Sequence, residues 1–263
     1  MKKDMSILKE KKLFVLDMDG TFYLGSKIID GSLRFIGKLR ELKKDFIFFT
    51  NNSSRDSETY LKKLAGMGLE VDGVKVITSG DITIKYLQEK YPKKGVYLVG
   101  TEYLESSFRR AGIELKQHRA DVVVIGFDTT LTYEKISKAC GFIREGAVFV
   151  ATHPDLNCPV EHGSIPDCGA MCSMITASTG VLPKYLGKPF EETIIGIRRI
   201  TGYNNDDMVF VGDRLSTDIA IGAKNNVTSI LVLSGETKIK DLERSDIQPD
   251  FVFDSLSHII DHL

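Results

Sequence analysis

Nine short apolar runs recur along this chain of 263 residues, and glycine or a polar residue closes or follows each of them. The runs lie at 13–17, 46–52, 74–80, 96–100, 121–127, 147–152, 208–213, 229–235 and 250–254. Apolar and polar residues do not alternate within them, which is typical of strands buried on both faces, as in a parallel sheet. Segments with helical spacing separate the runs, so the sequence predicts an α/β protein.

Three of the intervening segments show a clear apolar stripe. The stripes are formed by Leu33, Ile36, Leu39 and Leu42; by Tyr60, Leu61, Leu64 and Met67; and by Ile194, Ile195 and Ile197. We expect Ser53 or Ser54 to cap the start of the second helix. Gly66 or Gly68 is expected to end that helix, and Gly202 to end the third.

Polar side chains gather where the predicted strands end. Asp17 and Asp19 come directly after the run Leu-Phe-Val-Leu. A second run ends in Thr50, Asn51 and Asn52, and a third ends in Gly212 and Asp213. Two carboxylates held this close raise each other's pKa, a conflict that a divalent cation would remove. Open α/β sheets carry their chemistry beyond the carboxyl ends of the strands, so we expect a site there.

Composition excludes several classes of partner. The formal net charge is −1, which favours neither nucleic acid nor an anionic membrane as a partner. No stretch approaches the roughly 20 apolar residues that a membrane span needs. The charged segment 1–12 lacks the apolar core of a signal peptide, and we therefore expect a cytoplasmic protein.

A group of potential metal ligands lies in the middle of the chain, at His153, Cys158, His162, Cys168 and Cys172. A zinc site is conceivable, but the close Cys-x-x-Cys pair of structural zinc sites is missing. In a reducing compartment the cysteines are expected to be free thiols.

Four motifs occur in order: "DMDGT" (17–21), "TNN" (50–52), "GKP" (187–189) and "GDRLSTD" (212–218). Each has an ordinary explanation by itself, as a turn, a loop or a helix start. Together they resemble the four motifs of the haloacid dehalogenase (HAD) superfamily of phosphotransferases. The subgroup that the chain most resembles is the NagD-like phosphatases, because "GFDTTLTYEKI" (126–136) and "ATHPDLNCP" (151–159) are similar to its cap domain.

This resemblance implies a Rossmann-like core with a parallel sheet and an inserted α/β cap. It implies that Asp17 is the nucleophile, which becomes an aspartyl phosphate. Asp19 would protonate the leaving oxygen and then activate water. Lys188 would neutralise charge on Asp17 and on the phosphoryl group. The phosphoryl oxygens would be held by Thr50, Asn51 and Asn52.

The resemblance also implies a Mg²⁺ cofactor. The metal would be bound by a side-chain oxygen of Asp17, the backbone carbonyl of Asp19 and the side chain of Asp213. Asp218 would lie at the edge of the metal site, in contact through water or through another ligand. Such sparse protein ligation with retained water suits Mg²⁺.

Motif spacing places the cap. Only 33 positions separate Asp17 from Thr50, whereas 138 separate Thr50 from Lys188. The longer gap is large enough for an inserted domain, which we place at residues 80–182. The core is then formed by residues 1–79 and 183–263.

The sequence departs from the family pattern in the predicted cap. Residues 165–174 read "IPDCGAMCSM" where Pro-Gly-x-Gly is common, and His153 stands where Asn is frequent. These departures bear on substrate identity. His153 could contact substrate or make a hinge hydrogen bond, and contacts of Cys158, Cys168 or Cys172 with substrate also stay open.

The sequence therefore predicts a Mg²⁺-dependent phosphatase of small phosphomonoesters, such as sugar phosphates, nucleotides or 4-nitrophenyl phosphate. One alternative is a phosphomutase of the same superfamily, but the 33-residue spacing leaves no room for the helical cap of those enzymes. Another is a phosphoacceptor such as a receiver domain, which would lack Asp19. A third is a non-catalytic protein that binds phosphometabolites, although every motif residue is intact. A homo-oligomer is possible.

Overall fold

The computed structural model describes residues 4–160 and 163–263. The chain forms two compact units. The first comprises Met1–Thr50, Tyr60–Ile77 and Lys188–Leu263, and the second comprises Asn51–Thr59 and Thr78–Gly187. The assignment of residues 80–182 as a cap that sets specificity stays a prediction.

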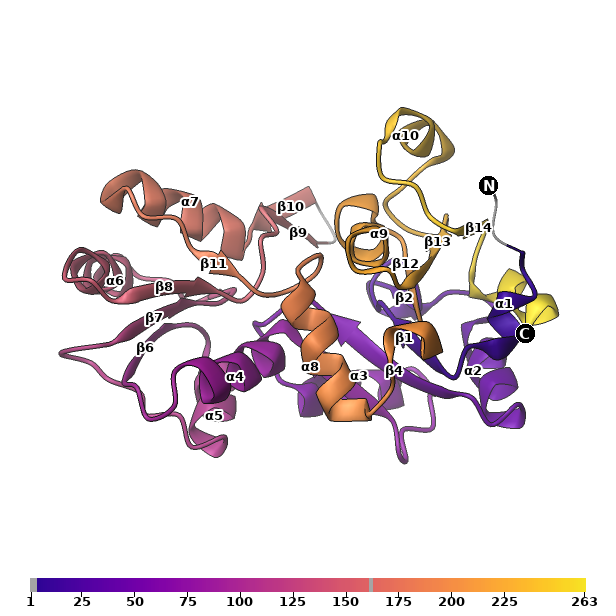
Figure 1. Cartoon of the computed structure of the whole chain (residues 1–263), viewed down its shortest axis with the longest axis horizontal. Coiled ribbons are helices and arrows are strands. Elements are labelled where there is room, and N and C mark those ends of the chain that lie inside the picture. The colour runs from indigo at the N-terminus through magenta and orange to yellow at the C-terminus, as the bar shows by residue number, and fades with distance from the viewer. Residues whose placement is uncertain (1–3, 161–162) are drawn as a thin grey trace. The chain divides into compact units, whose positions relative to one another are not determined.

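The first unit is built on a six-stranded sheet with the order β14-β13-β12-β1-β4-β5 (Figure 1). Its strands are β1 (Leu13–Leu16), β4 (Asp45–Thr50), β5 (Lys75–Thr78), β12 (Met208–Gly212), β13 (Thr228–Val232) and β14 (Phe251–Phe253). β1 lies between β12 and β4 and runs parallel to both. The strands that follow β1 first, β4 and β5, lie on one side of it, and the later strands β12, β13 and β14 lie on the other. A topological switch point therefore lies at the carboxyl end of β1.

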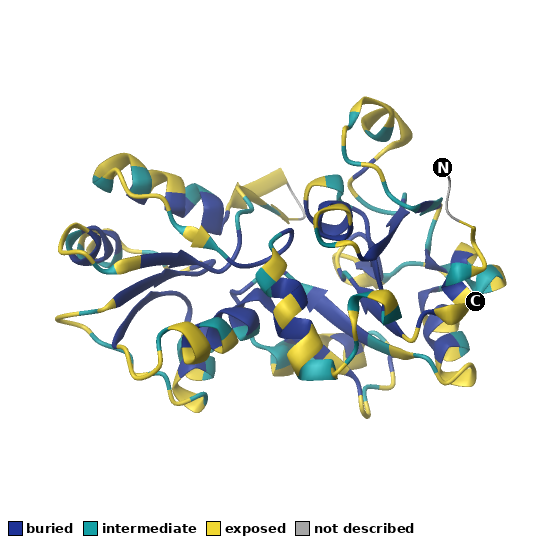
Figure 2. Ribbon diagram, in the orientation of Figure 1, coloured by how far each residue is buried: buried dark blue, intermediate teal, exposed yellow. Residues whose placement is uncertain are grey.

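Helices cover both faces of this sheet. Phe14 and Leu16 point to the face that packs on α2 (Ser32–Glu41), α3 (Ser57–Gly66) and a 3₁₀ helix, Leu256–His262. Leu13 and Val15 are also buried, on the opposite side of the strand. α9 (Ala220–Asn225) packs against β12 and β13 and also against α8 (Glu191–Thr201). The strands are accordingly buried along most of their length (Figure 2).

The second unit has a parallel sheet of its own, with the order β11-β8-β7-β6. Its strands are β6 (Val96–Val99), β7 (Val122–Ile125), β8 (Val148–Ala151) and β11 (Lys184–Tyr185). Side chains on one face of this sheet, such as Val99 and Ile125, pack on α6 (Tyr133–Arg144) and α7 (Cys168–Thr179). Side chains on the opposite face, such as Leu98 and Val124, pack on α4 (Ser79–Lys90) and α5 (Glu102–Arg110).

Shorter elements complete the two units. They are α1 (Ile7–Glu10), the hairpin of β2 (Tyr23–Leu24) and β3 (Lys27–Ile28), the hairpin of β9 (Asn157–Val160) and β10 (Gly163–Pro166), a 3₁₀ turn (Asn205–Asp207), a π-helical turn (Leu215–Ile219) and α10 (Ile239–Arg244). Within the described ranges, no helix has the length and apolar character required to cross a bilayer.

The α/β class and all nine predicted strands are confirmed, and Gly66 and Gly202 end their helices as expected. The predicted cap of α3 is wrong. The helix begins at Ser57, and the carboxylate of Asp56 accepts the N–H of Thr59 at 2.9 Å. Ser53 and Ser54 instead bond to other side chains, as described below.

The predicted stripe on α2 is also displaced. Leu33 and Leu42 are 40% and 37% exposed, whereas Phe35 is buried with Ile36 and Leu39. Phe35 lies four positions before Leu39, and Leu33 lies three positions before Ile36, so helical spacing is compatible with either residue and only packing against the sheet selects Phe35.

Candidate active site

Two neighbouring strands bring Asp17 and Asp213 together. β1 and β12 run parallel with Leu16 opposite Val211, and the Asp17 N–H donates to the Val211 carbonyl at 2.9 Å. Asp17 follows β1, and Asp213 follows β12 directly. The two carboxylates therefore leave the sheet at the same edge, in agreement with the placement expected from the sequence.

Lys188 joins Asp17 to Asp218. Its Nζ lies 2.6 Å from Oδ1 of Asp17 and 2.6 Å from Oδ1 of Asp218. The other Asp218 oxygen accepts the backbone N–H of Arg214 at 3.1 Å. Burial alone would lower the pKa of Lys188, but the two carboxylates raise it well above its usual value. Lys188 is therefore a buried ammonium that is paired with two acids.

Asp213 is less well compensated. Its Oδ2 accepts the backbone N–H of Glu236 at 2.7 Å, whereas its buried Oδ1 has no hydrogen-bond partner among the described residues. Burial, together with the charges of Asp17 and Asp218, raises the pKa of Asp213 to about 8. Burial also raises the pKa of Asp17 to about 7, despite the Lys188 ammonium. One ammonium does not balance three acids at this edge.

Two glycines let the surrounding loops approach Asp213. A Cβ at Gly20 would lie 2.3 Å from Oδ2 of Asp213, and a Cβ at Gly235 would lie 2.0 Å from the same atom. Gly20 also has a φ of +86°, which L residues with a side chain rarely adopt. These positions accept only glycine without displacing the carboxylate.

This donor set fits a hard divalent cation. Asp17, Asp213 and Asp218 each offer a carboxylate oxygen, and these atoms all lie within 4.8 Å of one another. Carboxylate oxygens are the ligands that Mg²⁺ prefers. The unpartnered Oδ1 of Asp213 is an acceptor that a cation would satisfy.

Asp19 lies near a lysine that sequence analysis did not single out. A single β-bridge joins Asp19 to Tyr23, and the Gly20 N–H donates to the Tyr23 carbonyl at 2.7 Å. The Lys63 ammonium lies 3.8 Å from the centre of the Tyr23 ring. Partial loss of solvent around the Asp19 carboxylate raises its pKa, and Lys63 opposes that rise. Nothing in the sequence distinguishes Lys63 from an ordinary solvated lysine of α3.

Comparison with known proteins assigns the family. A model described as haloacid dehalogenase-like hydrolase matches residues 14–114, and one described as HAD-hydrolase-like matches residues 185–259. The acid sugar phosphatase of Staphylococcus aureus is 34% identical over 257 residues, which cover 97% of this chain and 99% of that protein. The chain belongs to the haloacid dehalogenase-like hydrolases.

Solved structures place this HAD hydrolase in the NagD-like subgroup. A 4-nitrophenylphosphatase from Thermotoga maritima matches with a TM-score of 0.94 and 43% identity, over 97% of this chain and 98% of that one. NagD from Escherichia coli matches with a TM-score of 0.87 and 28% identity, over 94% and 97% of the two chains. The resemblance stated from the motifs is confirmed, and the chain is a phosphatase of the NagD-like type.

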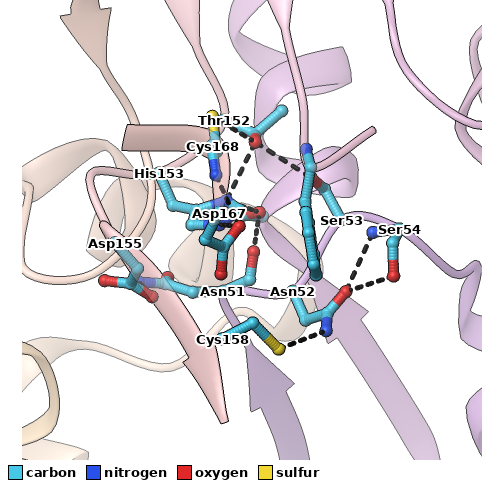
Figure 3. Close-up of polar contacts among 12 residues, drawn as sticks. Asn51, Asn52, Ser53, Ser54, Thr152, His153, Asp155, Cys158, Asp167 and Cys168 are labelled. Atoms are coloured by element: carbon cyan, nitrogen blue, oxygen red, sulfur yellow. Dashed lines mark hydrogen bonds and ion pairs between the residues drawn. The ribbon is translucent and has the colours of Figure 1, made fainter. Parts of the chain in front are cut away.

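In this HAD hydrolase, Thr50 ends β4 in the first unit, and the asparagines that follow it belong to the second. Asn51 Nδ2 donates to Oδ2 of Asp155 at 3.2 Å, and Asn52 Nδ2 lies 3.8 Å from Sγ of Cys158 (Figure 3). The Ser54 N–H and hydroxyl both donate to Oδ1 of Asn52, at 2.9 and 2.7 Å. The loop after β4 is thus held by hydrogen bonds on several sides.

The central cysteines of this HAD hydrolase are free thiols. Cys168 and Cys172 are buried on α7, and Cys158 is half-buried on β9. His153 bonds to Asp167 and to hydroxyl groups (Figure 3). His162, the remaining member of the group noted in the sequence, lies outside the described residues.

Proposed function

We propose that this hydrolase is a Mg²⁺-dependent phosphatase that acts on small phosphomonoesters through an aspartyl-phosphate intermediate. The observation that carries the proposal is the Asp17 carboxylate, held 2.6 Å from the buried Lys188 ammonium at the edge of the sheet that also presents Asp213. Phosphoryl transfer depends mainly on positioning and on charge neutralisation, and this arrangement supports both.

In the first half-reaction a carboxylate oxygen of Asp17 attacks phosphorus, and the bond between phosphorus and the leaving oxygen breaks. Asp19 donates its proton to that oxygen, so the alcohol leaves neutral. In the second half-reaction Asp19 takes a proton from water as the water oxygen attacks phosphorus, and the bond between phosphorus and the Asp17 oxygen breaks. Inorganic phosphate leaves, and Asp17 and Asp19 return to their starting states. Acid–base help of this kind contributes about 10²- to 10⁴-fold in rate.

The Lys188 ammonium orients Asp17 and neutralises part of the carboxylate charge that would otherwise repel the phosphoryl group. Thr50, the backbone N–H of Asn51 and the following residue, Asn52, are proposed to hold phosphoryl oxygens. The residues proposed to hold Mg²⁺ are Asp17, the Asp19 carbonyl and Asp213, with Asp218 at the edge of the site. When bound, Mg²⁺ supplies positive charge that offsets the carboxylates and the phosphoryl oxygens.

The names of two relatives support the substrate class. They are an acid sugar phosphatase and a 4-nitrophenylphosphatase. We propose that sugar phosphates are substrates here, that 4-nitrophenyl phosphate is accepted, and that residues 80–182 set the selectivity among esters. A cytoplasmic location is part of the proposal, because a reducing compartment preserves four free thiols.

The test is phosphate release from sugar phosphates, nucleotides and 4-nitrophenyl phosphate, with Mg²⁺ and after chelation. Asp17→Asn should abolish turnover on every ester and leave the circular dichroism unchanged, because the amide is isosteric but a poor nucleophile. Asp246→Asn, which alters an exposed acid far along the chain, is the matched control and should retain full activity. Substantial activity in a folded Asp17→Asn variant would refute the assignment, as would full activity of the wild type after exhaustive chelation.

A further inference from the structure

A buried histidine lies at the centre of the polar network in the second unit (Figure 3). His153 follows β8 and has no exposed surface. Its Nε2 lies 2.8 Å from Oδ1 of Asp167, the residue that caps α7. The same Asp167 oxygen accepts the Cys168 N–H at 2.6 Å, which fixes the carboxylate in place. One side of the imidazole is therefore anchored to the start of a helix.

Three acidic groups face this imidazole: the carboxylates of Asp167 and Asp155 and the sulfur of Cys168. Burial alone would raise the pKa of Cys168, but a hydrogen bond with Cys172 and the charge of His153 lower it to about 7, so this sulfur carries negative charge beside the ring. Burial alone would lower the pKa of His153, but Cys168 and Asp167, with a smaller contribution from Asp155, raise it to about 9. The ring is thus an imidazolium at neutral pH, and both of its nitrogens donate hydrogen bonds.

The second ring nitrogen meets two hydroxyl groups. His153 Nδ1 lies 2.9 Å from Oγ1 of Thr152 and 3.3 Å from Oγ of Ser79. A charged ring can only donate to these oxygens, so each hydroxyl is free to direct its own proton onward. The Ser79 hydroxyl donates to the backbone carbonyl of Asn51.

The Thr152 hydroxyl extends the network to the next loop residue. Its oxygen lies 3.0 Å from Oγ of Ser53, which in turn accepts the Phe127 N–H at 2.9 Å. The loop is therefore held at Asn51 and again at Ser53, two residues on. Both attachments lead back to the His153 ring.

We infer that His153 is a positioning residue for phosphate binding, because its imidazolium directs the Ser79 hydroxyl onto Asn51 and so holds the loop that follows β4. The inference rests on the proposed function, in which the Asn51 N–H contacts the phosphoryl group. It adds a role for three residues, His153, Ser79 and Asp167, that the reaction itself does not use.

The geometry disfavours the other two roles considered for His153. Direct contact with substrate is blocked because the side chain is fully buried and both nitrogens are engaged. Ligand atoms of His153, Asp155 and Asp167 do lie within 4.8 Å of one another, as in a metal site. A metal bound through His153 would, however, have to displace the hydrogen bonds that its two ring nitrogens make to Asp167 and Thr152.

Loss of the proton on Nδ1 of His153 reverses the hydrogen bonds at that nitrogen. The neutral ring keeps its Nε2–H on Asp167, so Nδ1 becomes an acceptor and competes with the Asn51 carbonyl for the Ser79 proton. Phosphate binding should therefore weaken as the pH rises through about 9, the pKa of His153.

The test removes only the link between His153 and Asn51. Ser79→Ala deletes the hydroxyl and leaves the His153–Asp167 pair in place, while Ser79→Thr restores a hydroxyl. Binding of inorganic phosphate to the Mg²⁺-loaded protein is measured by calorimetry from about pH 6 to about pH 10, and KM and kcat for 4-nitrophenyl phosphate are measured in parallel. Ser173→Ala, which removes a hydroxyl bonded to the Gly169 carbonyl at 2.9 Å, is the matched control.

We expect Ser79→Ala to weaken phosphate binding and to raise KM about fivefold to tenfold, the effect of one lost hydrogen bond. Its phosphate affinity should not fall further above pH 9. Ser79→Thr should recover most of the affinity, and Ser173→Ala should match the wild type. Unchanged phosphate affinity and KM in folded Ser79→Ala would overturn the inference, as would a loss confined to kcat. Calorimetry needs no turnover, so this result is independent of the Asp17→Asn test of the proposed function.

Discussion

At the scale of single residues, the first unit concentrates opposite charges in a small volume. One ammonium, Lys188, is paired at 2.6 Å with each of two acids, and a third acid, Asp213, has a buried oxygen without a partner in the described part of the chain. Removing a member of such a group changes both the chemistry and the stability, in directions that electrostatics predicts.

Replacement of Asp213 should separate stability from activity. Asp213→Asn removes one of the three clustered acids and keeps an oxygen for the Glu236 N–H. We expect the melting temperature without metal to rise and the stabilisation by added Mg²⁺ to disappear, together with turnover. Thermal unfolding with and without Mg²⁺ checks this prediction. A Mg²⁺-induced shift equal to that of the wild type would show that Asp213 is not a ligand.

Asp19 should matter most where the leaving group needs a proton. Asp19→Asn should slow hydrolysis of a sugar phosphate about 10²-fold or more, and should affect 4-nitrophenyl phosphate much less, because nitrophenolate leaves without protonation. Single-turnover phosphorylation on the two substrates measures the difference. Equal losses on both would contradict the role of Asp19 as an acid.

At the scale of secondary-structure elements, the ends of β1 and β12 deliver Asp17 and Asp213 to one place. The loops after β1 and β13 then close on Asp213 through Gly20 and Gly235. The second unit uses a related arrangement, in which the segment after β8 and the start of α7 supply His153 and Asp167. In both units, strand ends place polar side chains that lie far apart in the sequence.

The loop after β1 can be tested with a matched pair of glycines. Gly20 and Gly25 both have a positive φ, but a Cβ would meet Asp213 at Gly20 and nothing within 4 Å at Gly25. Each alanine variant should lose roughly 1 kcal/mol of stability or somewhat more from backbone strain. Only Gly20→Ala should also lower kcat and weaken activation by Mg²⁺. Chemical denaturation and Mg²⁺ titrations of both variants check the prediction, and equal activity in the two would refute it.

At the scale of the whole molecule, each unit has a hydrophobic core of its own. In the first unit a cluster forms around Phe14 and Phe48, and in the second unit clusters cover opposite faces of β7. The carboxylates and Lys188 belong to the first unit. The acids and the lysine of the proposed reaction are therefore expected to act without the selectivity element, although His153, which is proposed to position the phosphate-binding loop, belongs to the second unit.

Removal of residues 80–182 tests this separation. A short Gly/Ser linker in their place should leave a core that hydrolyses 4-nitrophenyl phosphate slowly and ranks larger esters less sharply. Circular dichroism and cooperative unfolding must first establish that the shortened chain folds. If a folded core kept the substrate ranking of the whole chain, residues 80–182 would not be the specificity element.

The sequence by itself determined the fold class, because unalternated apolar runs signal buried parallel strands through local pattern alone. It also indicated where polar groups collect, since strand ends are visible as the points where those runs stop. The motif residues and their order were sufficient to identify the family, which the comparisons confirm. Their roles in the reaction stay predictions.

Tertiary structure alone decided which side chains meet. Lys188 bonds to a residue 171 positions away, and Ser79 reaches His153 across 74 positions. Asp56 caps α3, whereas Ser53, one of the predicted caps, bonds to Thr152, 99 positions away. Local patterns encode propensity and burial, but a hydrogen bond between distant residues depends on how strands and helices pack, and no short stretch of sequence specifies that.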